Sequence, residues 1–335
     1  MMFSQTNRFI RGYKWKGLGV SFSIFLLFIC ATLGLLFSPE FLSIKNIEII
    51  LFTTATYLPV TLGTQALLIL GRFDLSLGAQ ASLYGIIAGT SYAYTDSVAV
   101  AVIMPLVSAT LLGMVCGTLI AKFRLDQLVI TLAIMGIARS LALLFSDGRV
   151  VTTIPSGFDW VQKSVLSNIP DLVLIGLLTV IILDISFKNL TVFRRLYAVG
   201  GNSIAADKSG ISADFIVITT YIAAAIGAVA VGLIQTGRTL SASPLIFSDL
   251  AIYAIAACLV GGGTIHGGRG SMVGGALGLL AIVSTENLIL ISEVPVYWRQ
   301  LVIGLLLIIA LTLQVKPDFI TNTLKVVLFR QDRRD

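Results

Sequence analysis

Long apolar runs constrain this chain more than any other feature of its sequence. A membrane-spanning helix takes roughly 20 consecutive, mostly apolar residues, and hydrophobic residues fill 56% of the 335 positions. Charged residues make up only 12%, about half of the roughly 25% that is usual in soluble domains. A soluble protein of this length needs far more charge to cover its surface. The composition therefore excludes a soluble enzyme, a nucleic-acid-binding protein and a disordered chain.

Charged and turn-forming residues divide the apolar sequence into ten candidate membrane spans. The runs are rich in Leu, Ile and Ala and lack the two-residue alternation of barrel strands, which predicts helices. We therefore expect an all-α polytopic membrane protein of about ten transmembrane helices. The eighth run is short for a full crossing and is expected to be tilted, broken or extended into the next loop. The expected spans are 18–37, 47–70, 75–95, 98–120, 127–146, 170–187, 215–235, 250–262, 271–291 and 298–315.

The basic residues predict how these helices are oriented. Lys and Arg concentrate in cytoplasmic loops. With a cytoplasmic N-terminus, 17 of the 23 Lys and Arg residues fall inside and five outside, while Arg139 falls within a span. Both termini are then cytoplasmic, a condition that eight spans would also satisfy. The run 18–37 follows basic residues as in a signal peptide, but it is long for one and no cleavage pattern follows, so we expect it to be retained as the first span.

The chain is expected to form a single transmembrane domain over residues 1–335. Residues 188–214 are the most polar stretch between spans and are predicted to be cytoplasmic. Residues 316–335 form a short basic tail on the same side, and residues 147–169 lie outside. The net charge of +6 comes from basic residues that flank apolar runs. This pattern indicates membrane lipid headgroups rather than nucleic acid as the partner of the positive charge.

Few residues in the chain are suited to catalysis. The single histidine, His266, and three cysteines scattered through apolar runs form neither a metal-ligand pattern nor a Ser-His-Asp triad. Lys208 and Ser209 approach the end of a phosphate-binding loop, but Asp207 and Asn202 stand where that motif requires glycine. We therefore expect neither an enzyme nor a resident cofactor or metal, and any ATP would have to be hydrolysed by another chain.

Polar side chains within the expected spans are the candidates for a solute path. Such residues usually face a cavity or another helix, and a helix–helix hydrogen bond is the alternative for each. Arg139 and Glu286 could instead pair with each other structurally. Only Glu286 is an acidic residue well inside a span, which argues against a transporter driven by an ion gradient. The path candidates are Gln65, Thr131, Arg139, Gln235 and Asn287, with Glu286 as a further ionisable residue.

Glycine-rich segments are the remaining signal. Residues 261–270 contain more glycine than a tight turn needs, and Gly274, Gly275 and Gly278 follow in the next span. Glycine permits positive φ in the loop, and small residues on one helix face permit close helix packing. A second segment, Gly71 to Gly78, shares a Gly-Arg pair with the first.

The two glycine-rich segments and four others resemble the permease subunits of bacterial ATP-binding-cassette importers of the ribose, xylose and autoinducer-2 type. The six segments occur in the same order and extend over nearly the whole chain. Gly71 to Gly78 looks like the family's Gly-Gly-Ile-Asp-Leu-Ser-Val-Gly, although Arg72 and Phe73 replace Gly and Ile. The region 245–251 also departs from the family pattern. The other matching segments are Ile130 to Leu132 with Gly136 to Arg139, Tyr197 to Asn202 with Ser209 to Ile211, Ser241 to Pro244, Gly267 to Ser271, and Trp298 with Ile303 to Leu305.

The resemblance implies an inner-membrane permease that imports a small sugar or sugar-like solute. It implies as partners an ATPase subunit that uses ATP and Mg, a second permease subunit (identical or different), and a periplasmic or extracellular solute-binding protein. A permease of the same superfamily for nucleosides or branched-chain amino acids is the main alternative. An ion-gradient-driven transporter and a membrane enzyme are further alternatives.

Energy from the ATPase would then enter through a cytoplasmic segment, for which 188–214 is suited. Asn202 or Ser203 can cap a short helix over 204–209, and Gly210 can end it. The predicted coupling residues are Gly200, Gly201, Asn202, Ala205, Asp207 and Gly210. The predicted residues of the glycine-rich cytoplasmic loops are Asp74, Ser76, Gly78, Gly267, Gly268, Arg269 and Gly270.

Overall fold

The computed structural model describes residues 18–155, 157–158, 161, 170–292, 294–295 and 297–314. Within these ranges the chain is almost entirely helical, and the only β-contact is an isolated bridge between Val151 and Ala242. The predicted all-α class is therefore confirmed. The predictions for the N-terminal segment before residue 18 and for the basic tail at 316–335 concern residues outside the described ranges.

Each of the ten predicted spans coincides with a helix, because long apolar runs are signals that need no tertiary information. Three shorter elements lie between them: η1 (Pro39–Leu42), α8 (Thr191–Gly201) and α9 (Ser203–Lys208). The ten long helices are α2 (Leu18–Phe37), α3 (Ile44–Ile69), α4 (Leu77–Thr95), α5 (Val98–Ala121), α6 (Gln127–Phe145), α7 (Asp171–Asn189), α10 (Ala213–Thr239), α11 (Leu250–Val260), α12 (Met272–Ile291) and α13 (Tyr297–Gln314).

Six of the described helices are long and apolar enough to cross a membrane: α2, α3, α5, α6, α10 and α12. Helix α11 has only 11 residues, which agrees with the short eighth run. The structure therefore shows a membrane protein with six candidate spans among its helices.

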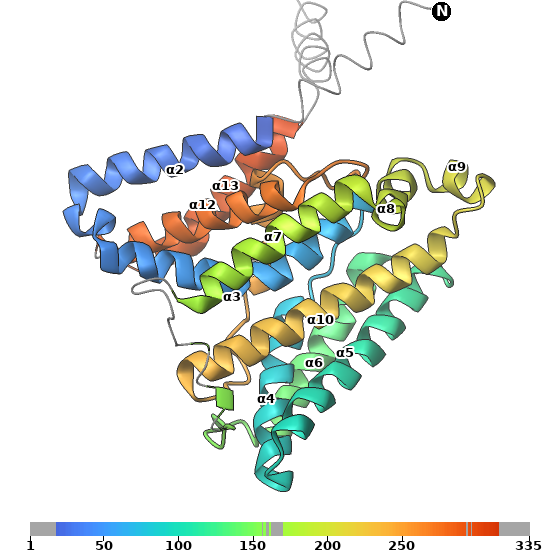
Figure 1. Ribbon diagram of the computed structural model, residues 1–335, viewed down its shortest axis with the longest axis horizontal. Coiled ribbons are helices and arrows are strands. Elements are labelled where there is room, and N and C mark those ends of the chain that lie inside the picture. The colour runs from blue at the N-terminus through green and yellow to red at the C-terminus, as the bar shows by residue number, and fades with distance from the viewer. Residues whose placement is uncertain are drawn as a thin grey trace, which may run out of the picture.

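The helices form two groups that meet along α3 and α10. Helices α4, α5, α6 and α10 make one group, and α2, α3, α7, α12 and α13 the other (Figure 1). The connection from α3 to α4 does not stay at the surface. It runs through the interior between the two groups, so that Asp74 is only 2% exposed.

Close packing of α11 on α12 depends on glycine. A Cβ added at Gly278 would lie 1.9 Å from the carbonyl oxygen of Ala257, and one at Gly261 would lie 2.0 Å from that of Gly274. Any side chain at these positions would separate the two backbones. The predicted small-residue face of residues 274–278 is thus confirmed as a helix contact.

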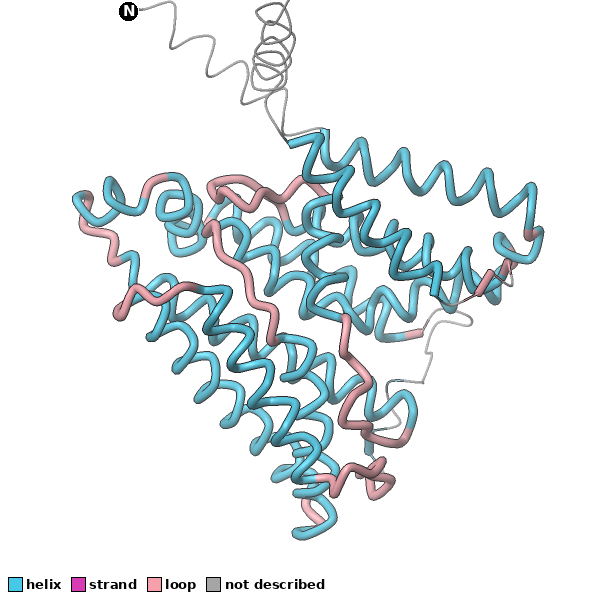
Figure 2. The backbone as a smooth tube through the Cα atoms, turned by 180° about the vertical axis from the view of Figure 1, so that it is seen from behind, coloured by secondary structure: helices cyan, strands magenta, loops and turns pink. Residues whose placement is uncertain are grey.

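The loops gather at two ends of the helices (Figure 2). We call one the α9 end; it holds α8, α9, the 122–126 loop and the 261–271 loop, and an ion pair of 3.1 Å between Arg124 and Asp214 joins two of its parts. The opposite end holds residues 147–155 and 240–249, which meet at the Val151–Ala242 bridge. Among the described residues, the cations of the α9 end are Arg72, Lys122, Arg124, Lys188, Arg194, Arg195, Lys208 and Arg269, and those of the opposite end are Lys45, Arg149, Arg238 and Arg299.

Candidate functional site

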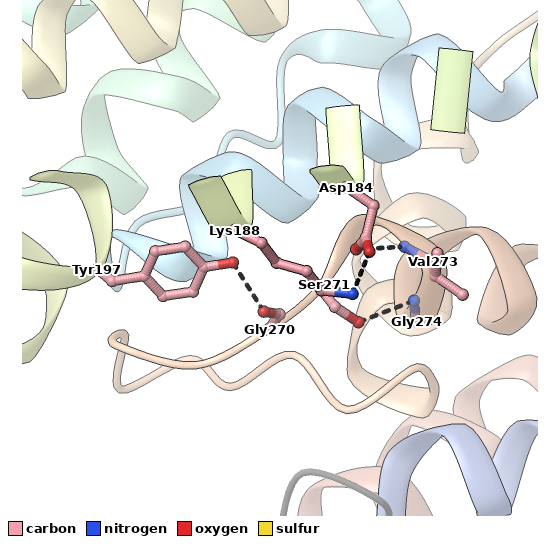
Figure 3. A network of polar contacts seen from close by, with 7 residues as sticks. All are labelled: Asp184, Lys188, Tyr197, Gly270, Ser271, Val273 and Gly274. Carbon is pink, nitrogen blue, oxygen red and sulfur yellow. Dashed lines mark hydrogen bonds and ion pairs between the residues drawn. The ribbon is translucent and has the colours of Figure 1, made fainter. Parts of the chain in front are cut away.

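Three segments far apart in the sequence converge at the α9 end: the end of α3, helix α8 and the 261–271 loop. The Gly268 N–H donates to the Ile69 carbonyl at 2.8 Å. The Tyr197 hydroxyl of α8 donates to the Gly270 carbonyl at 3.0 Å (Figure 3). Helix α8 approaches so closely that a Cβ at Gly200 would lie 1.9 Å from the Ile69 carbonyl oxygen. The glycine loop therefore lies directly against both α3 and α8.

A second set of contacts ties the end of α7 to the start of α12. Asp184 is 5% exposed and accepts a hydrogen bond from the Val273 N–H at 3.4 Å. Its carboxylate also pairs with Lys188, one turn later on α7 (Figure 3). Ser271 caps α12 by accepting from the Gly274 N–H at 3.0 Å. Negative charge at a helix N-terminus is stabilised by the helix dipole, so Asp184 holds α7 against α12.

Tyr197 belongs to the same network through its position beside α7. Its ring lies edge-on to Phe187, with centroids 6.4 Å apart. Burial raises the pKa of Tyr197 to about 12, and the nearby Asp184 carboxylate contributes to the increase. The hydroxyl is therefore protonated at neutral pH and can donate to Gly270. Through these contacts, a displacement of α8 would also shift the glycine loop and the start of α12.

Helix α9 forms where the sequence predicts a short capped helix. The Asn202 side chain accepts from the Ala205 N–H at 3.0 Å, and Asp207 accepts from the Ala213 N–H at 2.8 Å. Gly210 follows the helix at a φ of +80°, a left-handed conformation that glycine adopts without strain. Of α9 only Ala206 is buried, and Ile204 is 69% exposed. The helix is thus short, capped and open to a partner.

The structure brings most predicted coupling and loop residues together. Gly200, Gly267 and Gly268 are in backbone contact, and Asn202, Ala205, Asp207 and Gly210 shape the adjoining α9. Gly201 and Arg269 lie at this end too and are exposed.

Asp74, Ser76 and Gly78, predicted in a glycine-rich loop, are buried in the interior: Asp74 and Ser76 lie in the connection from α3 to α4, and Gly78 lies in the first turn of α4. In the interior, the polar groups of Asp74, Ser76 and Gln80 form a chain of hydrogen bonds. Asp74 accepts from the Ser76 N–H at 2.8 Å, and the Gln80 amide donates to the Ser76 hydroxyl at 2.6 Å. The Tyr84 hydroxyl then donates to Gln80 at 2.7 Å.

The predicted path residues do not form one lining. Gln65 is fully buried beneath the glycine loop, and Thr131 donates to the Leu128 carbonyl of its own helix. Asn287 exchanges hydrogen bonds of 2.8 and 3.0 Å with Asn46. Gln235 lies in the wall of a hollow near the opposite end.

Arg139 and Glu286 do not pair with each other, and Arg139 is exposed. Helix α6 buries one face through residues such as Ala138, and Arg139 lies on the exposed face. Glu286 pairs instead with Arg299 of α13, whose guanidinium also lies 5.2 Å from the centre of the Tyr253 ring. The exposure of Arg139 depends on which helices surround α6, which is tertiary information.

Sequence reasoning missed the role of Asp184, Lys188 and Tyr197 in joining α7, α8 and α12. The four-residue spacing of Asp184 and Lys188 at the end of an apolar run was the available signal. For Tyr197 the sequence offered no signal beyond its place in the segment from Tyr197 to Asn202, which resembles the permease family.

Comparison with known proteins places the chain among transport proteins. Residues 46–311 match the family described as branched-chain amino acid transport system / permease component. The chain belongs to this permease family. The permease is 27% identical over 314 residues to the ribose import permease of Haemophilus influenzae, covering 92% of this chain and 96% of that protein. It is 31% identical to the ribose import permease of Bacillus subtilis (87% and 91% covered) and 30% identical to the D-allose transport system permease of Escherichia coli (89% and 91% covered). No solved structure matches the permease.

Proposed function

We propose that this permease is the membrane-spanning subunit of an ATP-driven importer that moves a small sugar or sugar-like solute across a bacterial inner membrane. The relatives carry the proposal: they are named for ribose, L-arabinose and D-allose, and the matches cover 87% or more of both chains. The family description refers to branched-chain amino acids. A branched-chain amino acid is therefore the second candidate solute.

In this proposal all ten long helices lie in the membrane and both termini are cytoplasmic. The distribution of charge supports it, because the α9 end carries more of the described cations than the opposite end and cytoplasmic ends are enriched in Lys and Arg. The α9 end then faces the cytoplasm, and residues 240–249 face outward.

An ATPase subunit is proposed to dock on α8 and α9 and to use ATP and Mg there. The exposure of α9 and the contacts of α8 with the glycine loop support this role, since an ATPase that moves α9 would also move α8 and the start of α12. Residues 188–214 thus act as the coupling loop. A solute-binding protein docks at the opposite end.

A second permease subunit, identical or different, is proposed to face α6. Arg139 supports this arrangement, because it lies on an exposed face of a candidate span and a charged side chain in contact with lipid is costly. The facing subunit, or water between the two, would surround the guanidinium instead.

Uptake experiments test the proposed function. The permease is expressed with the ATPase and binding-protein subunits of neighbouring genes in a strain that lacks sugar and branched-chain amino acid importers. Radiolabelled D-ribose, L-arabinose, D-allose and L-leucine are supplied separately. We expect uptake of at least one sugar, dependent on an intact ATPase and resistant to a protonophore when ATP is maintained. Uptake of leucine alone, or sugar uptake that ends when ion gradients collapse, contradicts the proposal.

A further inference from the structure

The end of α3 faces the glycine loop at two levels. The first is the Ile69 carbonyl, which accepts from the Gly268 N–H at 2.8 Å. The second is the side chain of Gln65, one turn earlier, because residues four apart lie on the same face of a helix. Gln65 is completely buried. Its amide is therefore held between α3 and the loop, out of contact with solvent.

Neither the oxygen nor the nitrogen of the Gln65 amide has a hydrogen-bond partner among the described residues. A buried amide normally pairs both atoms, because leaving them unpaired is unfavourable. Gln80, which is equally buried, follows this rule: its nitrogen donates to the Ser76 hydroxyl at 2.6 Å, and its oxygen accepts from the Tyr84 hydroxyl at 2.7 Å. Gln65 departs from the rule at both atoms.

Three glycines enclose the unpaired amide. A Cβ added at Gly270 would lie 2.1 Å from the Gln65 nitrogen, and one at Gly263 or Gly275 would lie 3.1 Å from its oxygen. Gly263 and Gly270 belong to the glycine loop, and Gly275 lies in the first turn of α12. These positions leave room for the amide only as glycine, which accounts for part of the glycine content that a tight turn does not need.

The backbone of the loop offers hydrogen-bonding groups that the amide does not use. The N–H groups of Arg269 and Gly270 form no hydrogen bond with the described residues. The Gly270 carbonyl accepts one bond, from Tyr197, of the two that a carbonyl can accept. An amide side chain can itself donate two bonds and accept two. A small shift of the loop along α3 would bring such groups within reach of Gln65, and glycine permits the backbone changes that a shift requires.

The residue nearest the amide is also the one that α8 holds. The Tyr197 hydroxyl donates to the Gly270 carbonyl (Figure 3), and the Cβ position of Gly270 is the one closest to the Gln65 nitrogen. A displacement of α8 therefore acts on the loop directly beside Gln65.

We propose that Gln65 positions the glycine loop during transport: its amide is unpaired in the arrangement seen here and binds the loop backbone in a second arrangement. A group shifts the equilibrium between two conformations by the difference in its interactions with them. Gln65 therefore favours the second arrangement. The proposal rests on the proposed function, because the second arrangement is the one that an ATPase would produce by moving α8. Gln65, predicted as a path residue, is thus a positioning residue without contact to the solute.

Thermal unfolding of the purified complex without nucleotide tests whether the amide is unpaired. Gln65→Met keeps the length of the side chain and removes both polar groups, so we expect the midpoint to stay equal or to rise by a few degrees. Gln80→Met is the matched control and should lower the midpoint, because the Tyr84 hydroxyl loses its acceptor. A midpoint that falls equally in both variants overturns the proposal, since Gln65 would then already have a partner, such as a bound water.

Uptake tests the second arrangement. The solute is whichever of D-ribose, L-arabinose and D-allose the unaltered permease imports. In Gln65→Met we expect the maximal rate to fall roughly fivefold or more at equal amounts of permease in the membrane. The sugar concentration for half-maximal uptake, which the binding protein sets, should stay within about twofold. A merely structural role would lower stability together with uptake, whereas the proposal predicts lower uptake without lower stability. An unchanged maximal rate overturns it.

Thr61→Val is the control for uptake, because Thr61 lies one turn earlier on α3 and its buried hydroxyl donates to the Tyr57 carbonyl of the same helix at 3.1 Å. Its maximal rate should stay within about twofold of the unaltered permease, and a loss equal to that of Gln65→Met overturns the specific role of Gln65. If Gln65→Met does not reach the membrane, Gln65→Leu replaces it. Failure of both to assemble also overturns the proposal, because an apolar side chain should be tolerated in this arrangement.

The two proposals can fail separately. If the unaltered permease imports sugar and Gln65→Met imports it equally fast, the role of Gln65 is wrong and the proposed function stands. If only leucine is imported, the proposed solute is wrong, and the same comparison with leucine decides the role of Gln65. If no uptake depends on ATP, both proposals are wrong.

Discussion

Polar groups at the two ends of the permease are used in opposite ways. At the α9 end, Asp184, Tyr197 and Ser271 all have partners within the protein, at distances up to 3.4 Å. Around the hollow near the opposite end, by contrast, the polar side chains of Gln235, Ser241 and Ser243 are half-exposed. The α9 end also contains backbones in direct contact, as at Gly200 and Ile69.

This difference indicates that the two ends respond differently to a displacement. Groups that are paired with one another transmit displacement, since moving one requires moving the next. Half-exposed groups exchange hydrogen bonds with solvent and can move independently. The α9 end is therefore suited to transmit movement from a partner, and the polar groups around the hollow are not.

The largest effect should come from Gly200→Val. Its Cβ would collide with the Ile69 carbonyl oxygen, 1.9 Å away, and with the Gly268 nitrogen, 2.9 Å away. Because both are backbone atoms, α8 must leave the glycine loop, and we expect uptake to be lost. Gly201→Ala is the control, since a Cβ there meets nothing within 4 Å. Normal uptake by the Gly200 variant, at normal membrane levels, would show that contact between α8 and the loop is unimportant.

Gly210→Val should have the next largest effect, without any steric collision. Gly210 has a φ of +80° and open space around its Cβ position, and a β-branched residue is strained in that conformation. The end of α9 must therefore rearrange. We expect a stable permease in which loaded binding protein stimulates ATP hydrolysis about tenfold less, which corresponds to ~1.4 kcal/mol of coupling. Unchanged stimulation would remove α9 from the coupling path.

Asn202→Ala should weaken the same step more mildly. It removes the bond from the Ala205 N–H to the Asn202 side chain, and loss of such a cap costs about 1 kcal/mol of helix stability. Stimulated ATP hydrolysis should fall severalfold, and Asn202→Asp, which keeps a capping oxygen, should restore most of it. A variant with aspartate that is as impaired as the alanine variant contradicts a capping role.

The smallest effect is expected for Lys188→Met. The Lys188 side chain is 65% exposed although its partner Asp184 is buried, so solvent screens the cation and we expect its contribution to be about 1 kcal/mol or less. The thermal midpoint of the purified complex should shift by no more than a few degrees. Asp184→Leu should lower it further, because this change leaves the Val273 N–H at the start of α12 without its acceptor. Equal shifts would mean that Asp184 acts only through the ion pair.

Local signals account for the parts of this architecture that the sequence predicts well. The length of each apolar run places a helix without reference to its neighbours, and Asn202 and Gly210 delimit α9 through bonds and dihedral angles within nine residues. The glycines of α12 predict a close helix contact, but they do not identify α11 as the partner.

The rest depends on contacts between distant segments. The Tyr197–Gly270 bond joins residues 73 positions apart, and no spacing rule connects them. Asp74 looks like a loop residue by charge, yet its bonds with Ser76 satisfy the carboxylate and permit burial. Arg139 looks like a buried ion within an apolar run, yet α6 exposes that face. The hollow likewise arises only when α4 and α10 are packed together.

Site-specific photo-cross-linking tests the central claim, that the α9 end receives the ATPase, most directly. A benzophenone amino acid replaces Ile204 on α9, which is 69% exposed, or Tyr94 near the end of α4, which is 90% exposed. The complete transporter is irradiated in intact membranes, and the cross-linked partners are identified by mass spectrometry. The account predicts that position 204 captures the ATPase subunit and that position 94 does not. Capture of the ATPase from position 94, with none from 204, would contradict both the orientation and the coupling role of α9.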